Sequence, residues 1–300
     1  MKAYREIIKH LPLANYALTL SLLIWVGFNL VGCATSTPTH VSTFTAKTGE
    51  SAEVANYRKL AEQGNAKAQF VLGGSYLEGT GVAKDESLAV AWFRKSAEQG
   101  NFDAQFALGW VYENGTGVAK DLTQAVDWYR KAAEQGFAGG QFILGRMYEK
   151  GTGVAKDATQ AVAWFRKAAE QGDANGQLYL GLMYSEGTGV DKDATQAAAW
   201  VRKAAEQGNV KAKLLLGDIY LAGLGVAKDD TQALGWFQQA MVGFRKAAEQ
   251  GDAEAQYFLG SMYEDGLGVT KDENQASSWY QKAAAQGYEQ AQEALKKSSK

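Results

Sequence analysis

Residues 101–136, NFDAQFALGWVYENGTGVAKDLTQAVDWYRKAAEQG, hold the pattern that determines the fold of this 300-residue chain. The phrase that closes this stretch, Ala-Glu-Gln-Gly, occurs six times, ending at Gly64, Gly100, Gly136, Gly172, Gly208 and Gly251, and a variant ends at Gly287. Successive copies are 36 residues apart, except that the step from 208 to 251 is 43 residues. A fixed period of this length predicts a stack of repeats, each burying its apolar face on its neighbours.

The first half of the stretch predicts a helix with one buried face. Its apolar residues fall at i, i+4, i+7 and i+8, namely Ala104, Leu108, Val111 and Tyr112. Asn101 stands where an N-cap belongs. Asn or Asp recurs at this position in the other copies except at Phe137. Gly115 is expected to end the helix, since glycine tolerates the left-handed turn that follows many helices.

The second half predicts a second helix, which begins after Asp121. Asp-x-x-Gln, here Asp121 and Gln124, resembles a capping box and recurs in five copies. The apolar residues that follow are spaced for one face, and they are Ala125, Trp128, Tyr129, Ala132 and Ala133. We expect the recurring Trp to occupy a core position. We interpret the Arg-Lys pairs, such as Arg94-Lys95, as a solvated face paired with nearby Glu. No strand signal appears, so the fold class is all-α.

These residues resemble the Sel1-like repeat family, which is related to the tetratricopeptide repeats. The resemblance rests on Leu108-Gly109-x-x-Tyr112, on the Gly-x-Gly-Val loop, and on Ala-x-x-Trp followed by Lys-Ala-Ala in the second helix. It implies a right-handed α-solenoid of helix hairpins in which the first helices line the concave face. It also implies an adaptor that binds proteins or peptides.

The chain divides into five parts on this basis. They are a signal peptide (1–32), a tether that begins with a lipidated Cys (33–51), an N-terminal capping helix (52–64), six repeats, and a C-terminal capping helix (288–300). The repeats span 65–287, with bounds 65–100, 101–136, 137–172, 173–208, 209–251 and 252–287. Capping helices are expected because the terminal repeats of a solenoid need their apolar faces shielded.

The N-terminus predicts secretion and a lipid anchor. Basic residues precede an apolar run that ends in Leu30-Val31-Gly32-Cys33, which resembles the lipobox of bacterial lipoproteins. The resemblance implies cleavage before Cys33 and acylation of that residue, and stable attachment needs more than one acyl chain. Neither Ala34 nor Thr35 is acidic, so the resemblance favours the outer membrane, facing the periplasm. The alternative is an uncleaved membrane helix with an incidental Cys.

Composition argues against several classes of function. Basic and acidic residues number 31 and 33, which is unlike a nucleic-acid-binding protein. The repeats contain no Cys or His, so we expect no metal site, no cofactor and no thiol or imidazole catalysis. The competing hypothesis is an envelope enzyme acting on β-lactam or peptidoglycan-type substrates, because cysteine-rich Sel1-like proteins have been linked with β-lactams. This chain lacks their paired Cys and lacks a Ser-x-x-Lys motif.

Positions where the copies differ are the candidates for partner binding. Trp110 follows Leu-Gly in the first helix, where the other copies carry Gly74, Arg146, Leu182, Asp218 and Ser261. Such variety predicts a position outside the core, and Trp and Arg often anchor interfaces. The predicted partner-binding residues are Trp110, Arg146, Asp218, Glu113 and Glu149. The alternative is that Trp110 packs on a neighbouring helix.

The 43-residue repeat contains a seven-residue insertion. Residues 238–244, QQAMVGF, echo residues 231–237, TQALGWF. Seven residues rotate a helical face by only about 20°, so the second helix should lengthen by two turns with its apolar face preserved. In one interpretation Met241, Val242 and Phe244 form a protruding ridge for a partner or for self-association. In the other interpretation the insertion is a tolerated duplication.

The sequence therefore predicts a non-enzymatic, lipid-anchored scaffold of the bacterial cell envelope. Its partners would be proteins or peptides. Cys33 would attach the chain to the membrane, and no nucleic acid would be bound. Within this class the resemblance leaves open a factor for exopolysaccharide export or one that binds host proteins. The partner and the oligomeric state do not follow from the sequence.

Overall fold

A computed structural model describes residues 50–298, which form fourteen helices and no strand. The first helices of the hairpins are α4 (Ala66–Glu78), α6 (Phe102–Asn114), α8 (Ala138–Lys150), α10 (Ala174–Glu186), α12 (Val210–Ala222), α14 (Ala253–Asp265) and the lone α16 (Glu289–Ser298). The second helices are the lone α3 (Ala52–Glu62), α5 (Glu86–Glu98), α7 (Leu122–Glu134), α9 (Ala158–Glu170), α11 (Ala194–Glu206), α13 (Asp230–Glu249) and α15 (Glu273–Ala285). The all-α repeat fold is thus confirmed. The predicted signal peptide, Cys33 and most of the tether lie outside the described residues.

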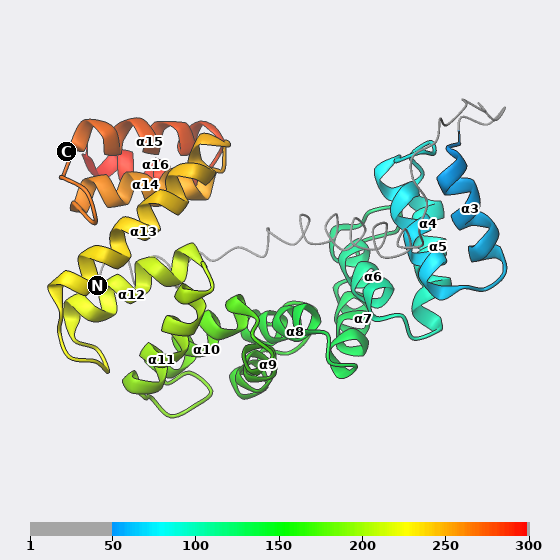
Figure 1. The fold of residues 1–300 in the computed structure, drawn as a ribbon, viewed down its shortest axis with the longest axis horizontal. Helices are drawn as coiled ribbons and strands as arrows, with labels where there is room; N and C mark the ends of the chain where they lie inside the picture. The colour runs from blue at the N-terminus through cyan, green and yellow to red at the C-terminus, as the bar shows by residue number, and fades with distance from the viewer. Residues whose placement is uncertain (1–49, 299–300) are drawn as a thin grey trace, which may run out of the picture. The chain divides into compact units, whose positions relative to one another are not determined.

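The described chain separates into two compact units, residues 50–168 and residues 169–298. Within the first unit, α3 to α8 pack in chain order, each helix on the next. The second unit repeats this arrangement from α10 to α16 (Figure 1). Within each of these two runs, every helix therefore contacts its sequence neighbours, as expected of a repeat stack.

The helix ends follow the predicted signals. Asn101 Oδ1 accepts a hydrogen bond from the Ala104 amide at 2.8 Å, and the helix ends at Gly115, whose φ is 74°. Asp121 caps α7 by accepting from the amides of Thr123 and Gln124, both at 3.0 Å. These interactions satisfy amides that the first helical turn leaves unpaired.

The exceptional cap residue, Phe137, makes ring contacts instead of a cap hydrogen bond. Its ring stacks on Phe102 with centroids 5.4 Å apart and meets the edge of Phe106 at 5.1 Å. Aromatic packing between consecutive repeats thus replaces a polar cap at this position.

The core of each hairpin pairs a glycine of the first helix with a buried side chain of the second. A Cβ atom added at Gly109 would lie only 2.6 Å from Tyr129 Cδ1, so only glycine lets the two helices approach this closely. The residues equivalent to Tyr129 are all buried, and they are Phe93, Phe165, Val201, Phe237 and Tyr280. The prediction that the preceding Trp occupies a core position is wrong for five of the six copies, in which the Trp is half-buried. It holds for Trp128, which is buried at 9% exposure.

The Arg-Lys pairs also differ from their predicted role. The ammonium group of Lys131 lies 3.7 Å from the centre of the Trp128 ring, and the same stacking recurs for Lys95, Lys167, Lys203 and Lys282. Arg94 donates to the hydroxyl of Tyr112 in the following hairpin at 2.6 Å. The same bond, 18 residues apart, recurs from Arg58, Arg130, Arg202 and Arg245. These side chains contact aromatic groups, and Arg130 in addition pairs with Asp127 of its own helix at 3.0 Å.

A buried glutamine joins successive repeats. Gln105, only 5% exposed, donates to the Ala97 carbonyl of the preceding helix at 3.2 Å and accepts from Gln135 at 2.7 Å. Gln69, Gln177 and Gln256 make the same pair of contacts. Gln99, Gln135, Gln207 and Gln286, which stand in the recurring Gln-Gly phrase, therefore satisfy the side-chain carbonyl of a buried amide in the preceding first helix.

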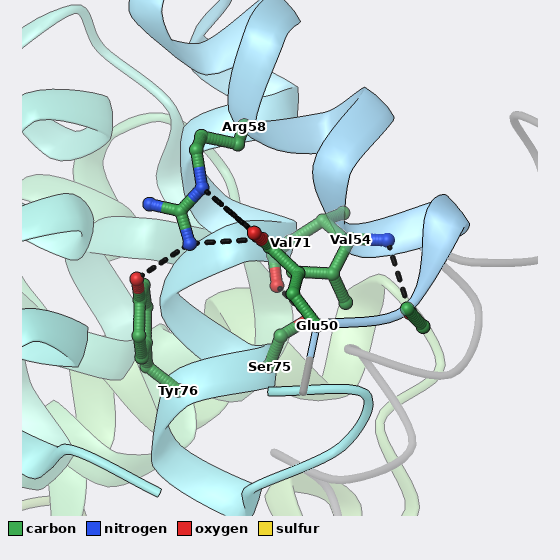
Figure 2. Close-up of polar contacts among 7 residues, drawn as sticks. Glu50, Val54, Arg58, Val71, Ser75 and Tyr76 are labelled. Atoms are coloured by element: carbon green, nitrogen blue, oxygen red, sulfur yellow. Dashed lines mark hydrogen bonds and ion pairs between the residues drawn. The ribbon is translucent and has the colours of Figure 1, made fainter. Parts of the chain in front are cut away.

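The N-terminal end of the stack is held by a charged network. Arg58 on α3 lies between the Glu50 carboxylate, at 2.8 Å, and the Tyr76 hydroxyl, at 2.7 Å (Figure 2). The hydrogen bonds that the Arg58 guanidinium donates to Glu50 and Tyr76 raise the pKa of Arg58 above its usual range. The Ser51 amide donates to the Gly81 carbonyl at 2.7 Å, so the chain entering α3 is fixed against the first glycine loop.

Candidate functional site

The variable position of the first helix is less exposed than its sequence variety predicts. Trp110 is half-buried, and its carbonyl accepts a hydrogen bond from the Asn114 side chain at 2.9 Å. Arg146 and Asp218 are 2% and 4% exposed. The equivalent Gly74 and Leu182 are also buried, whereas Ser261 is half-buried. Among the predicted partner-binding residues at this position, Trp110 therefore presents the most accessible side chain.

The two predicted glutamates both contact their own hairpin. Glu113 accepts a hydrogen bond from the buried Tyr129 hydroxyl at 2.8 Å. Glu149 lies 3.0 Å from the Arg146 guanidinium, one helical turn away. Both carboxylates remain half-exposed, so a partner could still reach them. Their role in partner binding stays a prediction.

Helix α13 has the predicted extra length, with 20 residues where the other complete second helices have 13. Of the three predicted ridge residues, only Val242 lies on the surface, at 71% exposure. Met241 and Phe244 are buried, and the Phe244 ring stacks on Phe258 of α14 with centroids 5.0 Å apart. The prediction of a ridge is therefore wrong for Met241 and Phe244, because the inserted turns pack on the next repeat.

The insertion shifts the place where the next repeat docks. At Gly117, Gly153 and Gly225 the second glycine of the loop packs against the first residue of the preceding second helix, so that an added Cβ at Gly153, for example, would collide with the Leu122 carbonyl. In the sixth repeat an added Cβ at Gly268 would instead meet the Gln238 amide nitrogen at 2.7 Å. Docking has thus moved along α13 by about two turns, which matches the seven inserted residues.

This shift uncovers a residue that the other repeats bury. Val90, Val126, Val162 and Ala198 are at most 6% exposed, but the equivalent Leu234 is 48% exposed. Met241, seven residues later, takes the covered position at 7% exposure. A groove of about 460 Å³ lies beside it, lined by Gln238, Met241, Val242, Arg245, Lys246, Glu249 and Gly268. The exposed Leu234 and this groove were not predicted from the sequence, although the seven-residue echo was their signal.

Two ionisable groups of this region have shifted pKa values. Burial raises the pKa of Glu254, against the opposing effect of Lys211 in the preceding repeat, whose ammonium is 2.7 Å away. Burial, together with the hydrogen bond to Glu264, raises the pKa of Tyr280. Within residues 50–298, no group of three or more His, Cys, Asp or Glu is placed to hold a metal ion. None of the helices in that range is both long and apolar enough to cross a bilayer.

Comparison with known families identifies the repeats. The model of the Sel1 repeat matches residues 66–101, 102–137, 138–173, 174–209, 210–240, 244–252 and 253–288. The chain belongs to the Sel1 repeat family. The match is interrupted at residues 241–243, inside the insertion that lengthens α13. A comparison with curated proteins finds no match.

Two solved structures of Sel1 repeat proteins are similar to this chain. The Sel1 repeat protein of Oxalobacter formigenes is 35% identical, with a TM-score of 0.64, over 81% of this chain and 97% of that protein. The protective antigen c5321 of uropathogenic Escherichia coli is 40% identical, with a TM-score of 0.62, over 81% of this chain. The match spans only 58% of the length of the Escherichia coli protein.

Proposed function

We propose that this Sel1 repeat protein is a lipid-anchored adaptor of the bacterial cell envelope. It binds protein or peptide partners through the face formed by the first helices of its repeats. Sel1 repeats generally mediate protein–protein interaction, which supports the coarser part of this proposal. The membrane anchor and the envelope location rest on the sequence before residue 50.

The observation that carries the binding proposal is the contrast between Trp110 and the recurring residues. The recurring Gly, Gln, Arg, Lys and Trp each have a packing role within the described repeats. Trp110 fills a position that is Gly, Leu or Ser in other repeats, so the hairpin does not need an indole there. A large aromatic group kept half-exposed is the type of side chain that anchors interfaces.

Photo-crosslinking in the native cell tests the binding face. A photoreactive amino acid replaces Trp110 in one strain and Lys95, an exposed residue of a second helix, in a control strain. One discrete protein captured at 110 and not at 95 would support the proposal. Equal capture at both positions, or none at 110, would refute the assignment of this face.

The anchor is tested separately by the mass of the mature protein. The proposal expects a chain that begins at Cys33 and carries acyl groups, located in the outer membrane. Replacing Cys33 by Ser should leave the signal peptide uncleaved and the acyl mass absent. An intact protein that retains residues 1–32 without acylation would contradict the anchor while leaving the binding face open.

We propose further that the protein acts by binding alone. The repeats lack His and Cys, and the described carboxylates noted above are engaged in packing contacts. Turnover of a β-lactam reporter by protein free of contaminating lactamase would overturn this part of the proposal.

A further inference from the structure

The exposed apolar residues of the described chain gather on the fifth repeat. Large apolar side chains that are substantially exposed number six, and four of them, Leu221, Leu224, Leu234 and Val242, lie in residues 209–251. Exposed apolar groups concentrated on one repeat indicate an interaction surface. The end of the array shows the contrast, because there the residue equivalent to Leu234 is the polar Ser277.

Five exposed residues follow one side of α13, and we name them the α13 seam. They are Asp230, Leu234, Gln238, Val242 and Arg245. Spacings of three and four residues place them next to one another on the helix surface. The seam carries an acidic group at its N-terminal end and a basic group at its C-terminal end, with the apolar Leu234 and Val242 on either side of Gln238 between them.

The seam is complementary to itself when two copies run antiparallel. Leu234 lies one turn after Asp230, and Met241 lies one turn before Arg245. Pairing Leu234 of one copy with the groove beside Met241 of the other therefore brings Asp230 opposite Arg245. The two-fold axis passes near Gln238, and each contact occurs twice, as a closed isologous dimer requires.

The charges at both ends of the seam are available for such contacts. Asp230 is paired only loosely with Lys228, at 3.4 Å, and both side chains are more than 60% exposed. Arg245 donates one hydrogen bond to the Tyr263 hydroxyl at 2.8 Å, which leaves further guanidinium N–H groups for an acceptor. The antiparallel arrangement also sets the N-terminal end of each helix beside the C-terminal end of the other, which the helix dipoles favour.

We propose that the α13 seam binds a second copy of this chain, forming an antiparallel helix pair in which each Leu234 enters the groove of the other copy. The inserted residues 238–244 create both halves of this interface. They uncover Leu234 by shifting the next repeat, and they supply Met241 and Val242 as its receptor. This proposal is independent of the binding face and of the lipid anchor.

Cysteine crosslinking of the full chain tests the geometry. Gln238→Cys places a thiol next to the proposed two-fold axis, whereas the control Gln239→Cys places one on the same helix about 100° away. Both positions are exposed. A disulfide needs Cα atoms within about 7 Å, so only position 238 should give a covalent dimer on mild oxidation. The unsubstituted chain, which carries Cys33, measures any background.

Charge exchange tests the pairing. In the Gln238→Cys chain, Asp230→Lys or Arg245→Glu alone should reduce the dimer yield by about tenfold or more, because each brings like charges together twice. The double exchange should restore the yield. Arg202→Glu, which breaks the equivalent Arg–Tyr bond on α11, should leave the yield unchanged. Equal crosslinking at 238 and 239, no crosslinking at 238, or no recovery in the double variant would overturn the proposal.

Discussion

The close approach of the two helices in each hairpin predicts that replacing glycine by alanine has opposite effects on stability at two positions of the fifth repeat. Gly217 and Gly235 both lie inside helices, but their surroundings are opposite. A Cβ added at Gly217 would be 2.5 Å from Phe237 Cδ1, whereas at Gly235 it would meet nothing within 4 Å. We expect Gly217→Ala to destabilise the protein and Gly235→Ala to stabilise it.

The magnitude follows from two terms. Replacing glycine by alanine inside a helix stabilises by about 0.8–1 kcal/mol at either site. At Gly217 the methyl group is about 1 Å too close to the Phe237 ring, and that ring is only 4% exposed, so it has little room to move. Overpacking of this kind costs about 1–3 kcal/mol. The difference between the two variants should therefore be about 2 kcal/mol, and it isolates the steric cost.

Urea denaturation followed by far-ultraviolet circular dichroism measures this difference. Repeat arrays can unfold in more than one step. The two variants are therefore compared only where the unfolding free energy depends on urea concentration with the same slope. A series of protein concentrations separates the comparison from self-association. If Gly217→Ala were as stabilising as Gly235→Ala, the tight packing of α12 on Phe237 would be refuted.

Three further predictions follow from other contacts. Gln105→Ala should destabilise by about 1–2 kcal/mol in the same denaturation assay, because it removes a buried bond between repeats. Gln292→Ala, at the equivalent but exposed position, should change stability by less than about 0.5 kcal/mol. The raised pKa of Tyr280 means that the folded state holds the phenolic proton more tightly than the unfolded state. The stabilisation that results from this tighter proton binding is therefore complete below about pH 10 and is lost progressively above it. Between pH 9 and 11 the free energy of unfolding should fall less for Tyr280→Phe than for the unaltered chain. Deleting residues 238–244 should restore the 36-residue period and cover Leu234. The protein should then remain folded by circular dichroism and elute as a monomer in size-exclusion chromatography at concentrations at which the unaltered chain elutes as a dimer.

The sequence was sufficient for the helices because their signals are local. Asn101, Gly115 and Asp121 act on the few amides and carbonyls around them, so their positions fix the helix ends directly. The same pattern could not separate a core aromatic residue from a half-buried one. Trp92 and Phe93 are consecutive residues of one apolar stripe, and the rotation of the helix against its partner decides that Phe93 is buried while Trp92 stays half-buried.

The candidate site was less predictable because it depends on contacts between repeats. Variety at the position of Trp110 suggested exposure, yet the structure buries Arg146 and Asp218 there. A recurring Arg likewise gives no hint of its partner, since the Tyr112 hydroxyl lies 18 residues beyond Arg94 on another helix. Such pairs become visible only when the stacking of one hairpin on the next is known.

The fifth repeat shows why the period of a solenoid controls its surface. Helix α13 offers two equivalent docking positions, Leu234 and Met241, because the echo repeats the same face after two turns. The short connection after Glu249 holds α14 against the last turns of α13, where the Ala248 carbonyl accepts from Gln256 at 3.1 Å. The next repeat is thus placed at the C-terminal part of α13, where Met241 is covered, and Leu234 is left exposed. A seven-residue insertion that preserves the helix thus converts one buried contact between repeats into an exposed apolar surface.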